Sequence, residues 1–107
     1  MSFEAYLGFT EGTATIHLAG ELGESSTPVF RSLVDQAGTR PLERLVLQMS
    51  ALRSISSAGV RALVWAHQMM GPRVEIILVG ARAEVRETIR LAGFDHSITI
   101  ATAGSSA

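Results

Sequence analysis

The sequence predicts an α/β fold with a mixed β-sheet in which the later strands run parallel. Residues 44–49 and 74–79 are short, strongly apolar runs of the kind found in strands that are buried on both faces. Segments with apolar residues at helical spacing separate these runs, and strands joined by helices form parallel pairs. Weak alternation of apolar and polar residues over residues 3–20 indicates an antiparallel pair of strands at the start of the sheet.

The first half of the chain is expected to supply two strands, a helix and a third strand. Thr27 followed by Pro28 favours a helix start, because proline suits the first helical position, and Gly38 is suited to end that helix. The expected elements are strands at residues 3–9 and 13–20 around a turn at 10–12, a helix over 27–38 and a strand at 44–49.

The second half continues the alternation of helices and strands. Gly71 and Pro72 end its first helix, and Gly93 stands where a glycine stops the second. The expected elements are a helix from Ser57 to Met70, a strand at 74–79, a helix at 81–92 and a last strand at 97–100. Residues 101–107 are expected to fray as a tail. The whole chain, residues 1–107, is thus expected to be a single domain with the order β-β-α-β-α-β-α-β.

Composition narrows the class of protein and its partners. A hydrophobic content of 47% with 18% charged residues excludes intrinsic disorder. A net charge of -1 gives no electrostatic reason to expect nucleic acid or an acidic membrane surface as partner. The chain has no cysteine, which excludes disulfides and thiolate metal sites and fits a cytoplasmic protein. No apolar run approaches the ~18 residues that a membrane span needs, so membrane insertion is not expected.

The sequence contains no recognisable set of catalytic residues. The three histidines, His17, His67 and His96, lack the spacing of metal ligands. There is no glycine-rich phosphate loop, no G-x-S-x-G segment and no S-x-x-K segment. The sequence therefore predicts a protein that is not an enzyme and that uses neither a metal nor a cofactor.

Two serines, Ser56 and Ser57, stand at the start of the helix that runs to Met70. Serine is a preferred N-cap, because its hydroxyl accepts a hydrogen bond from a free amide of the first turn. The same free amides and the positive end of the helix dipole also favour a phosphoryl group. A serine here can be a cap, a modification site or both, and Ser56 is the better candidate for the cap.

One stripe of this helix combines polar residues with a large aromatic residue. At ~100° per residue, the stripe consists of Ser57, Arg61, Trp65 and Gln68. A polar stripe is normally a solvent-exposed face. Trp65 departs from that pattern, since aromatic residues and arginine are enriched at protein interfaces. Two interpretations stay open, namely contact with a partner protein and packing of Trp65 onto a neighbouring loop.

Three short segments share their order and separation with the motifs of one family. Residues 19–22 (AGEL) are similar to a G-E-L/I segment that ends the second strand, and residues 55–60 (ISSAGV) to a D-S-S/T-G-L or S-S-A-G-L segment. Residues 89–94 (IRLAGF), followed by the expected last strand, are similar to an L-x-x-x-G-L/F pattern. Over nearly its whole length the chain thus resembles the STAS domain (sulfate transporter and anti-sigma factor antagonist). The resemblance implies a mixed sheet with helices packed mainly on one face.

The resemblance also implies a function. In free-standing STAS proteins that antagonise anti-sigma factors, the serine at the position matching Ser57 is phosphorylated by the partner kinase. It implies that Ser57 is a phosphoacceptor, that the partner is an anti-sigma factor with serine kinase activity, and that a matching phosphatase exists. The protein is then a cytoplasmic bacterial phosphoprotein that acts in signal transduction and transcription regulation through protein–protein interaction. The residues expected to contact the partner are Glu21, Gly23, Ser56, Ser57, Arg61, Trp65 and Gln68.

Two positions depart from the family pattern. Ser56 and Gly23 stand where phosphorylatable members commonly carry aspartate, close to the acceptor serine, so both departures bear on recognition by the kinase. They favour an alternative function, a non-phosphorylated STAS scaffold subunit of a signalling assembly or of a lipid-transport ATPase complex. The presence of Ser57 itself favours the phosphorylation switch.

Overall fold

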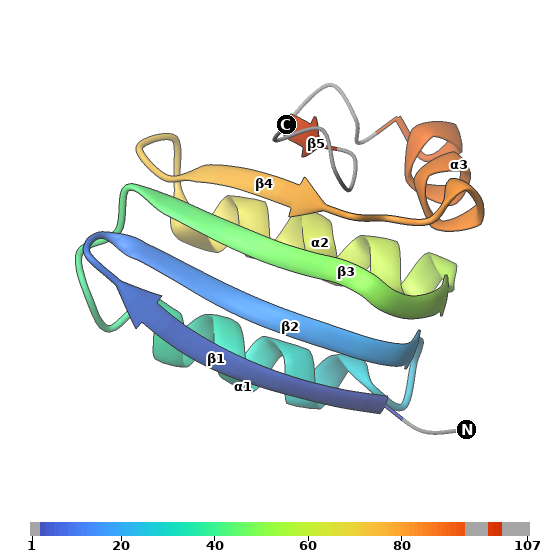
Figure 1. Cartoon of the computed structure of the whole chain (residues 1–107), viewed down its shortest axis with the longest axis horizontal. Helices are drawn as coiled ribbons and strands as arrows, with labels where there is room; N and C mark the ends of the chain where they lie inside the picture. Colours follow the sequence, from blue (N-terminus) through green and yellow to red (C-terminus); the bar gives the residue numbers. More distant parts are fainter. Residues whose placement is uncertain (1–2, 94–98, 102–107) are drawn as a thin grey trace.

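The computed structural model describes residues 3–93 and 99–101, which form five strands and three helices in the predicted order. In chain order the elements are β1 (Phe3–Thr10), β2 (Thr13–Leu22), α1 (Thr27–Ala37), β3 (Arg44–Ile55), α2 (Ser57–Met70), β4 (Glu75–Val79), α3 (Ala83–Leu91) and β5 (Thr99–Ala101). Figure 1 shows them in their arrangement in space.

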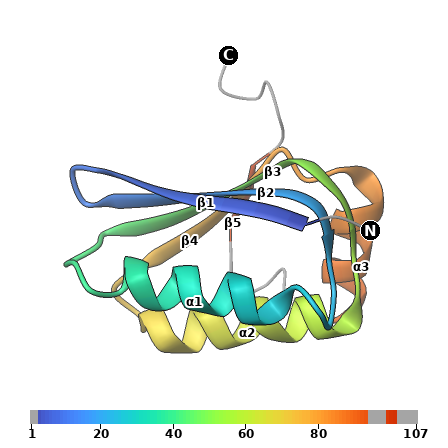
Figure 2. The ribbon, with the colours of Figure 1, turned by 90° about the horizontal axis from the view of Figure 1, so that it is seen from below.

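The five strands form one sheet whose spatial order, β1-β2-β3-β4-β5, is also their order along the chain. β1 and β2 pair antiparallel, and each later pair is parallel. α1 and α2 lie side by side under one face of the sheet, with α3 at its flank (Figure 2). The predicted α/β fold, a mixed sheet with helices packed mainly on one face, is therefore confirmed.

A tight turn at Glu11 and Gly12 joins β1 to β2. Both residues have a positive φ, 40° and 81°, as a type I′ turn requires at its two central positions. This turn type matches the twist of the flanking strands, and glycine adopts the conformation at little cost. The turn lies between Thr10 and Thr13, which are opposite each other, as predicted.

β3 is longer than predicted, since it continues beyond residue 49 to Ile55. Two irregularities of register, one of them beside Gly20 with its φ of 94°, keep this second half of β3 paired with the end of β2. They also break the alternation of side chains, so that Leu52 and Ile55 are buried three positions apart. Residues 50–55 therefore form a strand without showing a period of two.

The last strand is shifted relative to the prediction. Ala101, which we expected to begin the frayed tail, belongs to β5 and pairs with Val79 of β4. Pairing along the edge of β4 provides hydrogen-bond partners for this stretch of backbone. Residues 97–98, expected in the strand, and 102–107, expected in the tail, lie outside the described residues.

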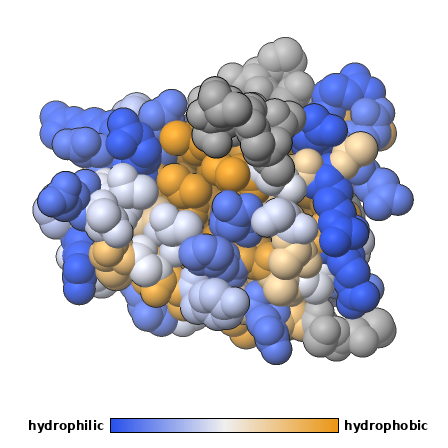
Figure 3. All heavy atoms as spheres, viewed as in Figure 1, coloured by the Kyte–Doolittle hydropathy of each residue, from blue (hydrophilic) through white to orange (hydrophobic). Residues whose placement is uncertain are grey.

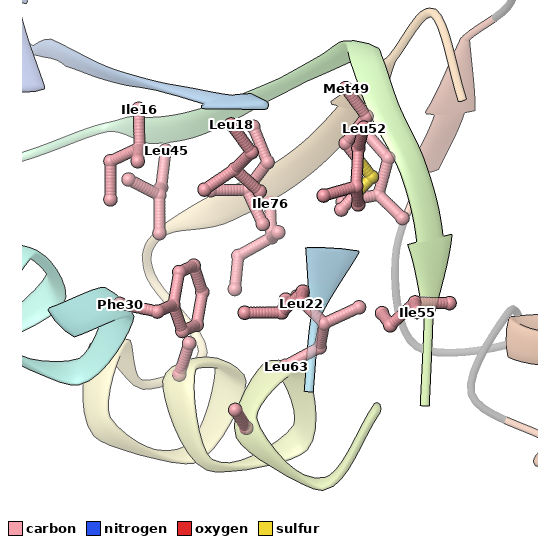
Figure 4. Close-up of a cluster of buried hydrophobic side chains, with 14 of the residues drawn as sticks. Ile16, Leu18, Leu22, Phe30, Leu45, Met49, Leu52, Ile55, Leu63 and Ile76 are labelled. Atoms are coloured by element: carbon pink, nitrogen blue, oxygen red, sulfur yellow. The ribbon is translucent and has the colours of Figure 1, made fainter. Parts of the chain in front are cut away.

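The core lies between the sheet and the helices (Figure 4). Phe30 of α1 and Leu63 of α2 meet side chains that descend from β2, β3 and β4. The fully buried members from β2 and β3 are Ala14, Ile16, Leu18, Leu22, Leu45, Leu47, Met49 and Leu52. Burial of a large apolar side chain contributes ~1.5–3 kcal/mol, so this layer fixes both helices against the sheet.

The face of the sheet without α1 and α2 is mixed in character (Figure 3). The rings of Tyr6 and His17 stack there, with centroids 5.5 Å apart. Half-buried Val46, Ile77 and Val79 contribute an apolar area over β3 and β4. The alternation of side chains along each strand explains this arrangement, because their neighbours in sequence point into the core.

The start of α2 lies directly against the end of β2. The backbone N–H of Ser56 donates a hydrogen bond to the carbonyl of Leu22 at 3.0 Å. A Cβ atom added to Gly59 would lie 2.4 Å from that carbonyl oxygen and 2.7 Å from Cγ1 of Ile55. Only glycine lets α2 begin this close to β2, and this contact therefore determines where Ser56 and Ser57 stand.

We expect Gly59→Ala to lower the free energy of unfolding by about 3 kcal/mol, the upper range for overpacking a tight site. The Leu22 carbonyl cannot move away without disturbing the pairing of β2 with β3. Chemical denaturation measures the change. Gly38→Ala is the matched control, because Gly38 has a φ of -72° and its nearest neighbours would stand 3.6 Å from a Cβ. Equal effects of the two substitutions would show that the contact at Gly59 does not limit the fold.

Candidate partner-binding site

Ser56 is the N-cap of α2. Its backbone is extended, with φ -95° and ψ 175°, and its hydroxyl oxygen accepts a hydrogen bond from the N–H of Gly59 at 3.3 Å. Its carbonyl accepts from the N–H of Val60 at 3.0 Å, the first bond of the helix. The prediction that Ser56, rather than Ser57, supplies the cap is confirmed.

Ser57 is the first residue of α2, and its side chain is exposed. Within the described part of the chain its hydroxyl has no hydrogen-bond partner. The free N–H groups of the first turn and the positive end of the helix dipole favour negative charge at this position. The first turn of α2 carries no acidic residue that would oppose such a charge. Ser57 is thus both accessible and placed where an added anion is stabilised.

A groove of about 270 Å³ opens beside Ser57, between α2 and the end of α3. It is lined by Ser57, Val60, Arg61, Val64, Thr88 and Ala92. Arg61 lies one helical turn after Ser57, at the spacing where side chains on a helix meet. The groove therefore combines an apolar wall with a hydroxyl group and an arginine.

The stripe predicted on α2 is divided by its neighbours. Trp65 is half-buried against the core, and the guanidinium carbon of Arg31 in α1 lies 5.3 Å from the centroid of its ring. Trp65 therefore leans toward α1, whereas Ser57 and Arg61 border the groove toward α3. Gln68 is exposed further along α2. Arg31, a neighbour of Trp65 in the structure, thus belongs to a helix, and contact of Trp65 with a partner protein stays a prediction.

The segment after β2 brings Gly23 beside Ser56. A Cβ atom on Gly23 would stand 3.5 Å from the Ser56 hydroxyl oxygen. The carbonyl of Gly23 accepts hydrogen bonds from the N–H groups of Ser26 and Thr27, at 3.0 and 3.1 Å. The Ser26 hydroxyl donates to the carbonyl of Glu21 at 2.8 Å, and the Glu21 side chain is exposed. Gly23, Ser56 and Ser57 therefore form one corner of the domain.

Four residues of the groove were not assigned to a site by the sequence analysis. Val60 and Val64 are apolar residues of α2 and did not belong to the predicted polar stripe. Thr88 and Ala92 come from the region of α3, which has a clear helical pattern but no feature that places it against α2. Only the folded chain brings these residues beside Ser57.

The described residues show neither a metal-binding cluster nor a membrane span. Among them, no group of three or more His, Cys, Asp or Glu side chains is placed to hold a metal ion. None of the described helices is long and apolar enough to cross a membrane. Among the titratable groups of residues 3–93, the pKa of Glu87 is lowered, because Arg90 donates hydrogen bonds to its carboxylate on the exposed side of α3.

A family model for the STAS domain matches residues 7–107. The chain belongs to the STAS domain family. The resemblance predicted from residues 19–22, 55–60 and 89–94 is therefore confirmed. Comparison with curated protein sequences gives no match.

Solved structures share the STAS fold of this chain at low sequence identity. An anti-sigma factor antagonist from Mycobacterium paratuberculosis is similar with a TM-score of 0.85 and 19% identity, over 94% of this chain and 86% of that one. The Bacillus anti-sigma factor antagonist SpoIIAA in its unphosphorylated form is similar with a TM-score of 0.76 and 20% identity, over 94% of this chain and 89% of that one. The phosphorylated form of SpoIIAA is similar with a TM-score of 0.68 and 19% identity, over 94% of this chain and 92% of that one.

The fold also occurs within a much larger protein. The murine anion transporter Slc26a9 gives a TM-score of 0.72 at 20% identity, and the match covers 83% of this chain but 16% of the transporter. Likeness at such identities establishes the fold alone. The function of this STAS domain has to be inferred from its own site.

We expect Ser56→Ala to lower the free energy of unfolding of this STAS domain by about 1 kcal/mol, because the N–H of Gly59 loses its acceptor. Ser57→Ala should change it by less than about 0.5 kcal/mol, since its exposed hydroxyl has no partner in the described chain. Urea denaturation of both variants makes the comparison. A larger loss of stability in Ser57→Ala than in Ser56→Ala would show that Ser57, and not Ser56, caps the helix.

Proposed function

We propose that this STAS domain is a regulatory protein-binding module of the anti-sigma factor antagonist type. Its partner is an anti-sigma factor that is also a serine kinase, and phosphorylation of Ser57 releases that partner. A matching phosphatase restores the binding form, and the cycle controls transcription in the bacterial cytoplasm. The observation that supports this most is the exposed Ser57 hydroxyl at the start of α2, on the border of a largely apolar groove.

Exposure and hydrogen bonding together distinguish Ser57 from Ser26 and Ser56. Ser26 is 8% exposed, and its hydroxyl donates to the backbone of Glu21. The Ser56 hydroxyl is engaged in capping α2. A kinase needs a hydroxyl that can enter its active site, and of these three serines Ser57 meets that requirement best.

The proposed contact surface has the groove as its centre. Interfaces typically have an apolar core with arginine and aromatic residues that contribute much of the binding energy. Val60, Val64 and Ala92 supply apolar surface in the groove, and Arg61 supplies the cation. Toward β2 the surface continues over Gly23 and Glu21, and along α2 it continues over Gln68 and the accessible part of Trp65.

Phosphorylation acts on this surface through charge and desolvation. A phosphoserine adds about -1.5 to -2 charges at neutral pH. On Ser57 that charge is stabilised within the domain by the first-turn N–H groups and by Arg61. A partner that covers the groove would have to strip water from the phosphate and from its apolar surroundings together. The complex dissociates for that reason, and the domain does not need to refold.

The residues at positions 23 and 56 favour a second candidate function. Because Gly23 lies next to the Ser56 hydroxyl, an acid at either position would lie close to Ser57. Their absence leaves the acceptor without the nearby carboxylates that phosphorylatable relatives commonly carry. A scaffold subunit that binds partners without being phosphorylated is compatible with this difference.

We expect Ser57→Asp to bind the anti-sigma kinase at least tenfold more weakly than Ser57→Ala, a difference of about 1.4 kcal/mol. The aspartate is stabilised by the helix dipole, so the variant should fold at least as well as Ser57→Ala. Isothermal titration calorimetry measures the affinities, and thermal melting measures the stabilities. Equal affinities, together with no phosphate on Ser57 in protein isolated from its own cells, would support the scaffold function instead.

A separate prediction concerns the two departures from the family. The double variant Gly23→Asp with Ser56→Asp should be phosphorylated faster by the cognate kinase, because both carboxylates lie beside the acceptor. Aspartate at position 56 also remains a good N-cap, so α2 is retained. Phosphate incorporation over time, compared with Ser57→Ala as the blank, gives the rates. An unchanged or lower rate would show that the kinase does not use these acids.

A further inference from the structure

β1 forms one edge of the sheet, and that edge is long and little protected. Its eight residues pair with β2 alone among the described strands, whereas β5 at the opposite edge has three residues. The free N–H and C=O groups of an edge strand can pair with another strand. Edge strands are therefore normally protected by lysine, by proline, by bulges or by being short. β1 contains a single charged residue, Glu4, and neither lysine nor proline.

The free backbone groups of β1 belong to every second residue. In an antiparallel pair, residues that exchange both hydrogen bonds alternate with residues that exchange none. A two-residue turn closes with a bonded pair, here Thr10 and Thr13, so the even-numbered residues of β1 direct their backbone groups toward β2. The residues that direct theirs outward are Phe3, Ala5, Leu7 and Phe9.

The flank beneath this edge is mostly apolar, and at its Phe9 end the guanidinium carbon of Arg40 lies 4.0 Å from the centroid of the Phe9 ring. The side chains of Phe3, Ala5, Leu7 and Phe9 are half-buried and pack at the border of the core. Val29 of α1 is 49% exposed. At ~100° per residue, Val29 lies about 160° around the helix from Arg31. The Arg31 side chain lies over the ring of Trp65 in α2 and so marks the side of α1 that faces α2. Val29 therefore lies on the β1 side of α1 and extends the apolar flank.

We propose that β1 pairs with β1 of a second copy of this chain, antiparallel about a two-fold axis at Leu7. The two sheets then become one continuous sheet, and the flanks beneath the two edges meet across the axis. The outward-pointing residues of one copy face those of the other, so every free N–H and C=O within the paired region finds a partner. Residues 4–10 of each copy are paired.

The sequence of β1 is complementary to itself in this register. Phe9 lies opposite Ala5 of the second copy, and Tyr6 lies opposite Gly8, so each large side chain meets a small one. Glu4 lies opposite Thr10, which avoids like charges on opposed positions. A register centred on Tyr6 would instead place the two Tyr6 rings opposite each other, although each already stacks on His17.

This interface leaves the candidate partner-binding site free. β1 and α3 lie at opposite sides of the domain in Figure 1, and the groove beside Ser57 lies between α2 and α3. The dimer therefore presents two grooves, and a dimeric partner could occupy both at once. The pairing of β1 does not depend on phosphorylation of Ser57, and its test does not require a partner.

Disulfide trapping tests the register directly, because the natural chain has no cysteine. In Leu7→Cys the two thiols face each other in a bonded pair, whose Cα atoms stand ~5.5 Å apart, within disulfide range. In the control Ala5→Cys the nearest thiol of the second copy is displaced by four residues, about 13 Å along the strand. Mild oxidation should crosslink Leu7→Cys nearly completely and Ala5→Cys very little. Equal crosslinking of the two, or efficient crosslinking through Tyr6→Cys instead, would overturn the proposal.

Sedimentation of the full, unmodified chain tests whether the dimer exists in solution. Thr10→Lys introduces an attractive pair with Glu4 on each side of the axis, and Thr10→Glu introduces a repulsive pair. The dimer dissociation constant should fall in the first variant and rise in the second, by about twofold to thirtyfold in each case. Thr10 is exposed, so both variants should melt close to the unmodified protein. A chain that stays monomeric at every accessible concentration, or two variants that shift alike, would refute the pairing.

Discussion

The geometry of this domain depends on one close contact, between the backbone of Gly59 in α2 and the carbonyl group of Leu22 at the end of β2. The missing side chain lets the helix begin against the strand, and the N–H of Ser56 bonds the same carbonyl at 3.0 Å. The helix is thus attached to the sheet at its first turn by backbone groups, and along its length by apolar packing. Any side chain at position 59 would separate the two elements and displace the serines.

The contact gives two adjacent serines different roles. Ser56 has an extended backbone and uses its hydroxyl to cap the helix, whereas Ser57 is the first helical residue and its hydroxyl is exposed. The capping hydroxyl and the hydroxyl without a partner in the described chain therefore reside on separate side chains. A modification of Ser57 can change the charge of the surface without removing the cap, which is what a reversible switch requires.

The elements of the fold were largely predictable because each has a local signal. Apolar runs indicated the parallel strands, and Pro28, Gly38 and Gly71 indicated the limits of helices. The second half of β3 had no such signal. Its register with β2 is irregular, so buried and exposed side chains do not alternate there, and Leu52 and Ile55 are buried three positions apart. Its strand character comes from the tertiary pairing, which periodicity cannot show.

The candidate site was predictable on α2 and not beyond it. The spacing of Ser57 and Arg61 follows from the helix itself, and the capping role of Ser56 follows from its position. The groove also needs Thr88 and Ala92, which are near Ser57 only because the chain crosses the sheet once more before α3. The direction of Trp65 toward Arg31 likewise depends on how α1 packs against α2. Such relations between separate elements have no signature in a single stretch of sequence.

The identity of spatial and sequential strand order has a consequence for synthesis. A chain leaving the ribosome can form the β1–β2 hairpin first and then add each strand to the far edge, with no strand inserted between two that are already paired. Each addition closes one crossover, and the entropy of closing such a loop rises only slowly with its length. α3 emerges after β4, and with it the second wall of the groove beside Ser57. A nascent chain thus has most of its sheet before the groove is complete, so a chain that still lacks α3 also lacks half of the surface proposed to bind a partner.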